Sequence, residues 1–327
     1  MADKRFIDAI HDALHEEMSR DASVVVLGED VGLKGGVFGV TEGLSEAFGE
    51  ARVIDTPLAE SCIVGVAIGM SVNGLRPVAE IQFADFIHPA FDQILSEAAR
   101  MRFRSKNDFG CPIVIRAPFG GGVHGALYHS QSIEAFYAHI PGLKVVVPGT
   151  PADAKGLLKS AIRDPDPVLY LEHKKMYRSL RGDVPDADVT VPIGPAVTRR
   201  PGRDLSIFAY GLMLQESLGA AEALAREGIE AEVVDVRTLR PLDTKTILAS
   251  VERTSRALIV HEDNRFGGFG AEIAATIAEE GFRFLDAPPT RLAGPDVPAV
   301  PFSAPFEAWF MLTADKIADA ARALVVY

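Results

Sequence analysis

The sequence predicts an α/β fold with two mostly parallel sheets, each covered by helices on both faces. Short apolar runs, typical of buried strands, alternate with segments whose apolar residues recur at helical spacing. The alternation stops once, in a stretch rich in proline and glycine, and then resumes. The 327 residues also exceed the roughly 250–300 at which a single hydrophobic core usually stops growing. We therefore expect two α/β domains.

The first series begins with an amphipathic helix, because Phe6, Ile10 and Leu14 fall on one helical face. Thr150 and Pro151 favour the start of a later helix, as an N-cap residue and a first-turn proline. The expected helices cover residues 6–18, 41–48, 61–72, 86–103, 130–137 and 152–162. The expected strands cover residues 23–28, 52–55, 76–83, 112–116, 144–147 and 168–172. This alternation indicates a doubly wound parallel sheet within residues 1–185.

Prolines and glycines interrupt the chain from residue 181 to residue 203, and we place a linker at 186–203. A second α/β domain is expected over residues 204–327. Its strands are predicted at 205–209, 232–236 and 257–261, and its helices at 215–227, 244–252, 271–280 and 313–324. The proline-rich segment 287–305 is expected to be irregular.

Composition excludes several classes of protein. The 33 basic residues against 45 acidic ones give a net charge of −12, which argues against nonspecific nucleic-acid binding. The longest nearly apolar run, residues 62–72, is too short to span a bilayer. Cys62 and Cys111 cannot form a disulfide framework and are expected to be buried free thiols in a reducing compartment. With no secretory signal at its charged N-terminus, the chain is expected to be cytoplasmic.

The sequence lacks the common phosphate-binding, zinc-binding and nucleophile-elbow motifs, so carboxylates and histidines in loops remain as candidates. Glu60, at the start of an apolar helix, is either a group that faces the helix amides or a carboxylate that binds a heterocycle. His129 follows a glycine-rich loop and is either structural or catalytic, since imidazole titrates near neutral pH. Gln82 either satisfies backbone groups or lines a pocket.

Two further patterns leave alternatives open. Gly65 and Gly69, four residues apart on one helix, favour either tight internal packing or a subunit contact. The helix end at residues 161–166 carries Asp164 and Asp166, which are either solvated or join backbone carbonyls to bind a monovalent cation.

Several separated stretches in the same order resemble the beta subunits of thiamine-diphosphate-dependent 2-oxo acid dehydrogenases. They are Leu27–Val31, Asp55–Glu60, Glu80–Phe86 and His129–Ser132, with Pro141–Val146 and Asp235–Leu239. The resemblance runs nearly from end to end. It implies a pyrimidine-type thiamine-diphosphate-binding domain followed by a transketolase C-terminal-like domain. It also implies a heterotetramer with an alpha subunit and a second beta chain, in which the alpha subunit binds magnesium and the diphosphate.

The resemblance assigns roles to individual residues. Glu60 matches the carboxylate that hydrogen-bonds N1′ of the cofactor's aminopyrimidine, and His129 matches an active-site histidine that acts in acyl transfer to lipoamide. Leu58, Gln82 and Phe86 are implied to line the cofactor pocket, although many branched-chain members have tyrosine in place of Phe86. The positions of a potassium site are Ile113, Ala161, Ile162, Asp164 and Asp166.

The stretches His124–Ser132 and Tyr170–Lys174 resemble the branched-chain type more than the pyruvate or acetoin type. The implied substrate is therefore a branched-chain 2-oxo acid, in a multienzyme complex with a dihydrolipoyl acyltransferase core that carries peripheral-subunit-binding and lipoyl domains. We hypothesise that Glu262, Asp263 and the carboxylate of Tyr327 contact this core. A hypothesis of another class is a catalytically silent scaffold that bridges alpha chains and the core.

Overall fold

The computed structural model describes all residues from 1 to 327. Its internal contacts divide the chain into two units. The first unit comprises residues 1–119 and 136–193, and the second comprises residues 120–135 and 194–327. The segment 120–135, which carries His129, therefore belongs by its contacts to the second unit. No helix is long and apolar enough to cross a membrane.

The first unit is built on a parallel sheet with the strand order β6-β7-β5-β4-β2-β3. The strands are β2 (Val24–Gly28), β3 (Val53–Asp55), β4 (Arg76–Glu80), β5 (Val114–Phe119), β6 (Lys144–Val146) and β7 (Val168–His173). The chain moves outward from β2 to β3 and then crosses to β4 on the other side. Strand order thus reverses beside β2, and ligands of such sheets bind beyond the carboxyl ends of the strands at this point.

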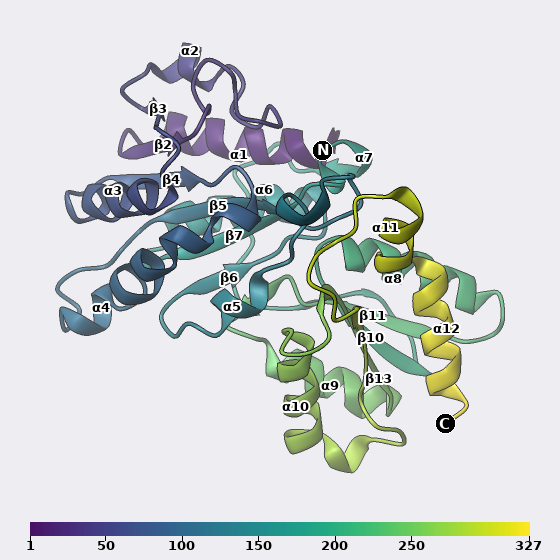
Figure 1. Cartoon of the computed structure of the whole chain (residues 1–327). Helices are drawn as coiled ribbons and strands as arrows, with labels where there is room; N and C mark the ends of the chain where they lie inside the picture. The colour runs from purple at the N-terminus through teal and green to yellow at the C-terminus, as the bar shows by residue number, and fades with distance from the viewer. The chain divides into compact units, whose positions relative to one another are not determined.

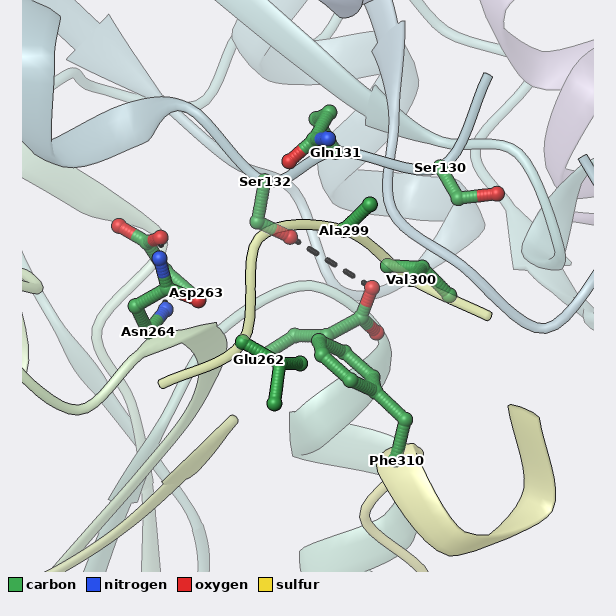
Figure 2. A pocket seen from close by; sticks show the side chains of 10 residues that line it. Ser130, Gln131, Ser132, Glu262, Asp263, Asn264, Ala299, Val300 and Phe310 are labelled. Atoms are coloured by element: carbon green, nitrogen blue, oxygen red, sulfur yellow. Dashed lines mark hydrogen bonds between the residues drawn. The ribbon is translucent and has the colours of Figure 1, made fainter. Parts of the chain in front are cut away.

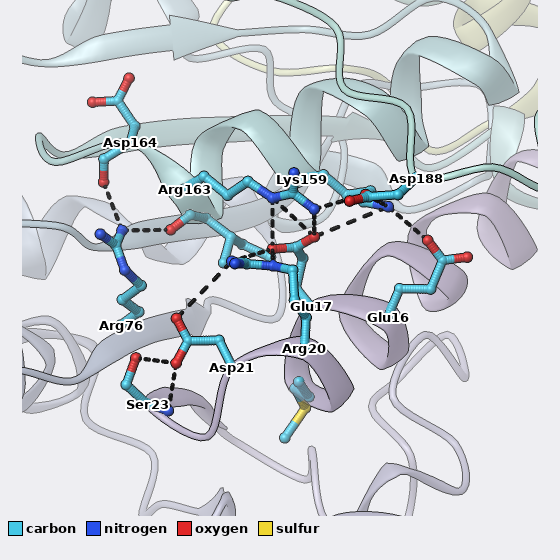
Figure 3. Close-up of polar contacts among 12 residues, drawn as sticks. Glu16, Glu17, Arg20, Asp21, Ser23, Arg76, Lys159, Arg163, Asp164 and Asp188 are labelled. Atoms are coloured by element: carbon cyan, nitrogen blue, oxygen red, sulfur yellow. Dashed lines mark hydrogen bonds and ion pairs between the residues drawn. The ribbon is translucent and has the colours of Figure 1, made fainter.

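The helices of the first unit are held to one another by ion pairs as well as by apolar packing. Helix α1 (Phe6–Arg20) packs against α6 (Pro151–Arg163), while α3 (Glu60–Val72) packs on β4. Figure 3 shows the polar layer between α1 and α6. Glu17 is fully buried and accepts hydrogen bonds from Arg163, and Lys159 pairs with Glu16 at 2.7 Å and Asp188 at 2.5 Å. The buried carboxylate is therefore compensated by cations from the neighbouring helix.

A buried arginine lies at the centre of the sheet. Arg116 on β5 pairs with Glu80 of β4 at 2.5 Å and with Glu172 of β7 at 2.6 Å. The hydroxyl of Tyr177 donates to Glu172, and all four side chains are buried. Burial raises the pKa of the Glu80 carboxyl, and Arg116 opposes this rise. The arginine thereby joins three adjacent strands through their side chains.

Three expectations about the first unit need correction. Residues 86–103 do not form one helix but short 3-10 turns at Ala84–Phe86 and His88–Ala90, a π-helix at Gln93–Ala98 and α4 (Met101–Arg104). Pro89, which has no N–H to donate, stands inside the expected helix. The short strands β1 (Ala2–Arg5) and β8 (Arg181–Val184) pair antiparallel and were not expected. Cys62 is exposed, whereas Cys111 is buried as expected.

The shorter helices in this unit follow the expected positions approximately. They are α2 (Leu44–Phe48) and α5 (Glu134–Ala138), whose first two residues belong to the second unit. The short helix α7 (Met176–Ser179) was not expected. Thr150 caps α6 by accepting a hydrogen bond from the amide of Asp153, with Pro151 in the first turn. The predicted cap is therefore confirmed.

The second unit contains a sheet with the order β14-β13-β10-β11-β9, parallel except for β9. Figure 1 shows α8 and α12 on one side of its central strands and α9 and α10 on the other. The strands are β9 (Val197–Arg200), β10 (Leu205–Ala209), β11 (Ala231–Asp235), β13 (Ala257–Asn264) and β14 (Thr290–Gly294), with a separate short strand β12 (Thr238–Arg240). The helices are α8 (Leu212–Ala225), α9 (Thr244–Thr254), α10 (Gly270–Glu280), α11 (Ala304–Phe310) and α12 (Ala314–Val325).

The expected series of elements is confirmed in this unit, but the proline-rich segment is more regular than predicted. It contains β14 and the first turn of α11, with Pro305 within that turn. A proline in the first helical turn loses no intrahelical hydrogen bond, so a proline-rich segment is compatible with a helix start.

The second unit also buries an acidic side chain whose charge is largely uncompensated. Glu134 is fully buried, and its Oε1 accepts a hydrogen bond of 2.8 Å from the hydroxyl of Tyr210. Its other oxygen has no hydrogen-bond partner. Burial, and next the nearby charge of Asp263, raise the pKa of Glu134 to about 8. The folded unit therefore favours the protonated form of Glu134 near neutral pH.

This raised pKa predicts a pH-dependent loss of stability that Glu134→Gln should reduce. Between its ordinary pKa of 4.5 and the folded pKa of about 8, the folded state holds a proton that the unfolded state has released. Unfolding is therefore favoured as the pH rises through this interval. Glutamine stays neutral, so the unfolding temperature of the variant should fall less than that of wild type from about pH 6 to about pH 8.5.

Thermal unfolding of both proteins at the two pH values tests this expectation. The exposed carboxylate Glu227, which pairs with Arg322, supplies a matched control as Glu227→Gln. A Glu134→Gln curve parallel to those of wild type and control would contradict the raised pKa.

Candidate functional site

The candidate site of the first unit lies where β2, β3 and β4 end. The loop after β3 is fixed by two hydrogen bonds, from the Gly32 amide to Asp55 Oδ1 at 2.6 Å and from the Thr56 amide to the Gly28 carbonyl at 2.9 Å. Glu60 is then the first residue of α3. Next to it, the Ser61 hydroxyl donates to the carbonyl of Pro89, which connects the helix start to the loop after β4. Local contacts thus determine where Glu60 lies.

The environment of Glu60 separates the two interpretations of this residue. The helix start has no side-chain cap hydrogen bond, and the half-buried Glu60 carboxylate makes no hydrogen bond or ion pair within the chain. Burial raises the pKa of the neighbouring Glu29 carboxyl, with further contributions from the charges of Asp30 and Glu60. The carboxylate of Glu60 is therefore available to a ligand instead of serving as a cap.

The residues that follow β4 supply aromatic rings and an amide. The rings of Phe83 and Phe86 meet edge to face with centroids 6.0 Å apart. Gln82 Nε2 makes only long contacts, 3.5 Å to the Glu29 carbonyl and 3.4 Å to Asp30. These groups suit a flat, polar heterocycle, which takes hydrogen bonds at its edge and apolar contact on its face.

The side chains of Thr56 and Leu58, which precede Glu60 in the chain, indicate which kind of ligand the site can bind. Thr56 Oγ1 is buried without a hydrogen-bond partner, and buried polar atoms are usually paired. Leu58 is 72% exposed, so the isolated chain leaves an apolar side chain in water at this place. Leu58, Gln82 and Phe86, the residues expected around Glu60, all follow β3 or β4. The aminopyrimidine of thiamine diphosphate fits this set of a free carboxylate, an orphan hydroxyl, an amide and aromatic rings.

A separate candidate segment is the loop of the second unit that carries His129. His129 is half-buried and follows a short 3-10 turn, Ala126–Tyr128. His124 and Ala126 have φ angles of +55° and +57°, a region that non-glycine residues rarely adopt. A Cβ atom at Gly125 would lie 2.6 Å from the His129 carbonyl, so glycine is needed for this close approach.

Behind the loop, the second unit offers a small polar cavity of about 10 Å3, which is roughly room for one water molecule. Figure 2 shows Ser130, Ser132 and Phe310 around it, with the Ser132 hydroxyl directed toward the Glu262 carboxylate at 3.5 Å. A cavity of this size excludes an organic ligand. Its role is therefore in the packing of the loop.

The acyltransferase contacts hypothesised from sequence are corrected in part. Glu262 is 4% exposed, and its Oε1 accepts a 2.6 Å hydrogen bond from the amide of Gly121. Asp263 is also buried, and burial raises the pKa of its carboxyl to about 6. Neither carboxylate is on the surface of this unit. Tyr327 is 75% exposed and keeps its place in the hypothesis.

The five positions expected for potassium lie around the end of α6 and the start of β5. The carbonyls of Ile113 and Ala161 accept backbone hydrogen bonds, and those of Ile162 and Asp164 accept from the guanidinium of Arg76. The carboxylate of Asp164 pairs with Lys144 at 2.6 Å, and that of Asp166 with Arg102 at 2.5 Å. Three cationic side chains of the chain itself therefore already bind these oxygens.

Sequence reasoning missed Glu307 and assigned Glu262 another role, yet both are buried carboxylates that bind the loop before His129. They follow the loop by more than a hundred residues, and no local pattern links them to it. Glu307 stands between the aromatic residues Phe306 and Trp309, and this polar residue in an apolar helix was the only available signal.

Comparison with known proteins agrees with the geometry. Residues 3–179 match the family model described as transketolase, pyrimidine binding domain, and residues 194–317 match transketolase, C-terminal domain. The chain is 56% identical over 322 residues to the 2-oxoisovalerate dehydrogenase subunit beta of Bacillus subtilis (strain 168), covering 98% of each chain. It is 50% identical over 324 residues to the pyruvate dehydrogenase E1 component subunit beta of the same strain, covering 99% of each.

A solved structure described as a split gene transketolase, inactive beta4 tetramer, is similar as well. It superposes with a TM-score of 0.79 at 27% sequence identity and covers 98% of both chains. Both domains, their order and the full length of the chain are thus shared with these relatives. The chain belongs to the family of beta subunits of thiamine-diphosphate-dependent 2-oxo acid dehydrogenases.

Proposed function

We propose that this chain takes part in the oxidative decarboxylation of branched-chain 2-oxo acids with acyl transfer to lipoamide, in an active site shared with an alpha subunit. The observation that carries the proposal is the half-buried carboxylate of Glu60, which makes no hydrogen bond or ion pair within the chain and lies at the start of α3, just after the end of β3. The relative at 56% identity is named for a branched-chain substrate, and this supports the choice of substrate.

Glu60 is proposed to act on the cofactor's aminopyrimidine. Its carboxylate would hold a proton at N1′ and thereby favour the imino tautomer of the exocyclic nitrogen. Thiamine diphosphate, when bound, supplies the carbon nucleophile and the electron sink for decarboxylation. Phe86, Leu58 and Gln82 would orient the ring and exclude water, which strengthens the hydrogen bond of Glu60. Magnesium and the diphosphate are proposed to be bound mainly by the alpha subunit.

His129 is proposed to act later, as the proton donor when the acyl group passes to the lipoyl sulfur. An imidazole suits this step because it exchanges protons near neutral pH. The half-buried position on an exposed loop would give it access to the lipoyl group of the acyltransferase. The two catalytic residues therefore serve different steps of one reaction.

Glu60→Gln should abolish most decarboxylation while the fold and assembly survive. Glutamine keeps the size of the side chain but cannot hold the N1′ proton, and loss of a positioned acid–base group typically lowers the rate by about 10²–10⁴-fold. The rate of decarboxylation by the assembled tetramer, followed with an artificial electron acceptor, measures the effect. Turnover close to wild type in a correctly assembled variant would remove this role from Glu60.

The competing substrate class is pyruvate or acetoin, favoured by the 50% identity to a pyruvate dehydrogenase subunit. The assay that decides combines the chain with its alpha subunit, thiamine diphosphate and magnesium, and compares 3-methyl-2-oxobutanoate, 4-methyl-2-oxopentanoate and pyruvate. We expect activity only in the mixture and strongest on the branched acids. Best activity on pyruvate would keep the mechanism and change the substrate. No activity of an assembled tetramer on any 2-oxo acid would favour the silent scaffold.

A second beta chain is a further proposed partner, and helix α3 is the proposed contact. This helix is apolar on all sides, yet Val66 and Val72 are 44% and 43% exposed. A Cβ at Gly69 would meet nothing within 4 Å, and one at Gly65 would meet only the Gln93 side chain at 3.8 Å. Tight packing inside the chain therefore does not explain the glycines, and this supports the proposal that another subunit approaches the helix there.

Gly65→Leu should prevent normal assembly without unfolding the chain. Leucine favours a helix by nearly 1 kcal/mol over glycine, so the single chain should not lose stability. Size-exclusion chromatography with light scattering, in the presence of the alpha subunit, should show smaller species. Ala323→Leu, on the exposed face of α12, is the matched control. A Gly65→Leu variant that assembles like this control would exclude α3 from the contact.

The remaining proposals follow the family resemblance. We propose that the pyrimidine-binding domain covers 1–185 and that 186–203 connect it to the C-terminal domain at 204–327, with β9 (Val197–Arg200) of this connection joining the sheet of the second unit. We propose docking to the acyltransferase core in the cytoplasm, where the free thiols Cys62 and Cys111 would stay reduced. Potassium stays a prediction. An ion at the end of α6 would share carbonyls with Arg76, so we propose weak binding.

A further inference from the structure

We infer that Glu307 is a positioning residue, which holds the loop before His129 in its active conformation. The inference rests on the proposed role of His129. It concerns only the second unit, in which residues 120–135 and α11 both lie.

Glu307 binds the loop with both carboxylate oxygens. Its Oε1 accepts hydrogen bonds from the backbone amides of Gly122 at 3.0 Å and His124 at 3.1 Å. Its Oε2 lies 2.6 Å from the Nδ1 atom of His124. One side chain thereby restrains two residues of the loop, Gly122 through its backbone and His124 through both backbone and side chain.

Burial makes these contacts stronger than similar contacts on a surface. Glu307 is 4% exposed, although its neighbours on α11, Phe306 and Trp309, are 65% and 55% exposed. A buried carboxylate has lost its water and depends on the donors that replace it. The donors are the two amides and the imidazole of the loop. The carboxylate and the loop conformation therefore stabilise each other.

The backbone of the loop shows why such a restraint is needed. His124 and Ala126 both have left-handed φ angles, and such conformations in non-glycine residues cost free energy that surrounding contacts must offset. Glu307 binds both the amide and the ring of His124 at the first of these positions. Without Glu307, we expect the loop to relax toward ordinary backbone angles and to displace His129, five residues further on.

A second anchor acts on the same loop from another element. The Glu262 carboxylate of β13 accepts from the Gly121 amide, and a Cβ atom at Gly121 would lie 2.9 Å from Met311 Sδ. The loop therefore lies directly against the segment that follows α11. The Glu262 contact fixes the beginning of the loop, and the hydrogen bond from the Gly120 amide to the Gln131 carbonyl, 3.0 Å long, joins its two ends. Glu307 controls the strained part between them.

The first test measures the loop directly and does not depend on catalysis. Hydrogen exchange of the assembled enzyme, resolved to residues 120–135, should increase strongly at Gly122 and His124 in Glu307→Ala and less in Glu307→Gln. Glutamine can still accept from the amides, but its NH2 group replaces the oxygen that faces His124 Nδ1. Glu227→Gln should leave the loop unchanged. Unaltered exchange of the loop in Glu307→Ala would overturn the inference.

The second test is a double-mutant cycle in acyl transfer to lipoamide. Glu307→Ala should lower kcat of this step by about 10²-fold, the loss expected from misplacing a catalytic group by about 1 Å. Decarboxylation, which depends on Glu60, should stay within about twofold. In His129→Ala, the added Glu307→Ala should cause little further loss, because the two changes remove the same contribution. If the losses of the two single variants multiply in the double variant, Glu307 has a general structural role instead. The same conclusion follows if Glu307→Ala slows decarboxylation and acyl transfer equally.

The two tests separate this inference from the proposed function. If Glu307→Ala loosens the loop but His129→Ala keeps full acyl transfer, the role of His129 fails while the restraint by Glu307 is confirmed. If His129→Ala is inactive and the loop is unaltered in Glu307→Ala, the function stands and the inference fails. Partial recovery of acyl transfer in Glu307→Gln over Glu307→Ala would support the restraint further.

Discussion

The pairing of Arg116 with Glu80 and Glu172 is the interaction on which the first unit depends most. Three charges are buried where β4, β5 and β7 lie side by side, and removing any one would leave the others uncompensated in a medium of low polarity. Glu80 is the last residue of β4, so its ion pair with Arg116 also fixes the point at which the chain leaves the sheet. Gln82 and Phe86 follow Glu80 in the chain. The positions of these side chains in the candidate site therefore depend on the ion pairs of Arg116.

The second unit repeats this arrangement with different residues. Glu262 and Glu307 are buried as carboxylates, and most of their donors are backbone amides of the loop before His129. Burial of a carboxylate is unfavourable unless its hydrogen bonds are made. The observed conformation of the loop supplies donors to both Glu262 and Glu307, and this favours it over other conformations. In each unit, a buried charge directly precedes or directly binds the segment that carries a functional residue. Buried charge gives these segments definite positions that apolar packing alone would specify less strictly.

Local patterns predicted the elements well where they were strong. The apolar runs at 24–28 and 205–209 are strands, and Thr150 caps α6 as expected. Prediction failed where a longer-range contact decides. The start of α11 lies in a proline-rich segment, and Pro89 lies inside what helical periodicity alone would extend from 86 to 103. Glu307 acts on residues 183 and 185 positions earlier, a relation that no periodicity contains.

The state of Glu60 explains why this chain needs a partner. A carboxylate at a helix start in water is screened, and a hydrogen bond from it to a heterocycle would compete with solvent. The Glu60 side chain is only half-buried in the isolated chain, and Leu58 beside it is mostly exposed. The chemistry proposed for Glu60 requires a dry site, because electrostatic interactions strengthen as water is excluded. Covering Leu58 with an apolar surface of another subunit would bury apolar area and dry the carboxylate in the same step. Under the role proposed for Glu60, assembly and activation of this carboxylate would be one event, since the surface that stabilises the complex would also be the surface that makes the carboxylate effective.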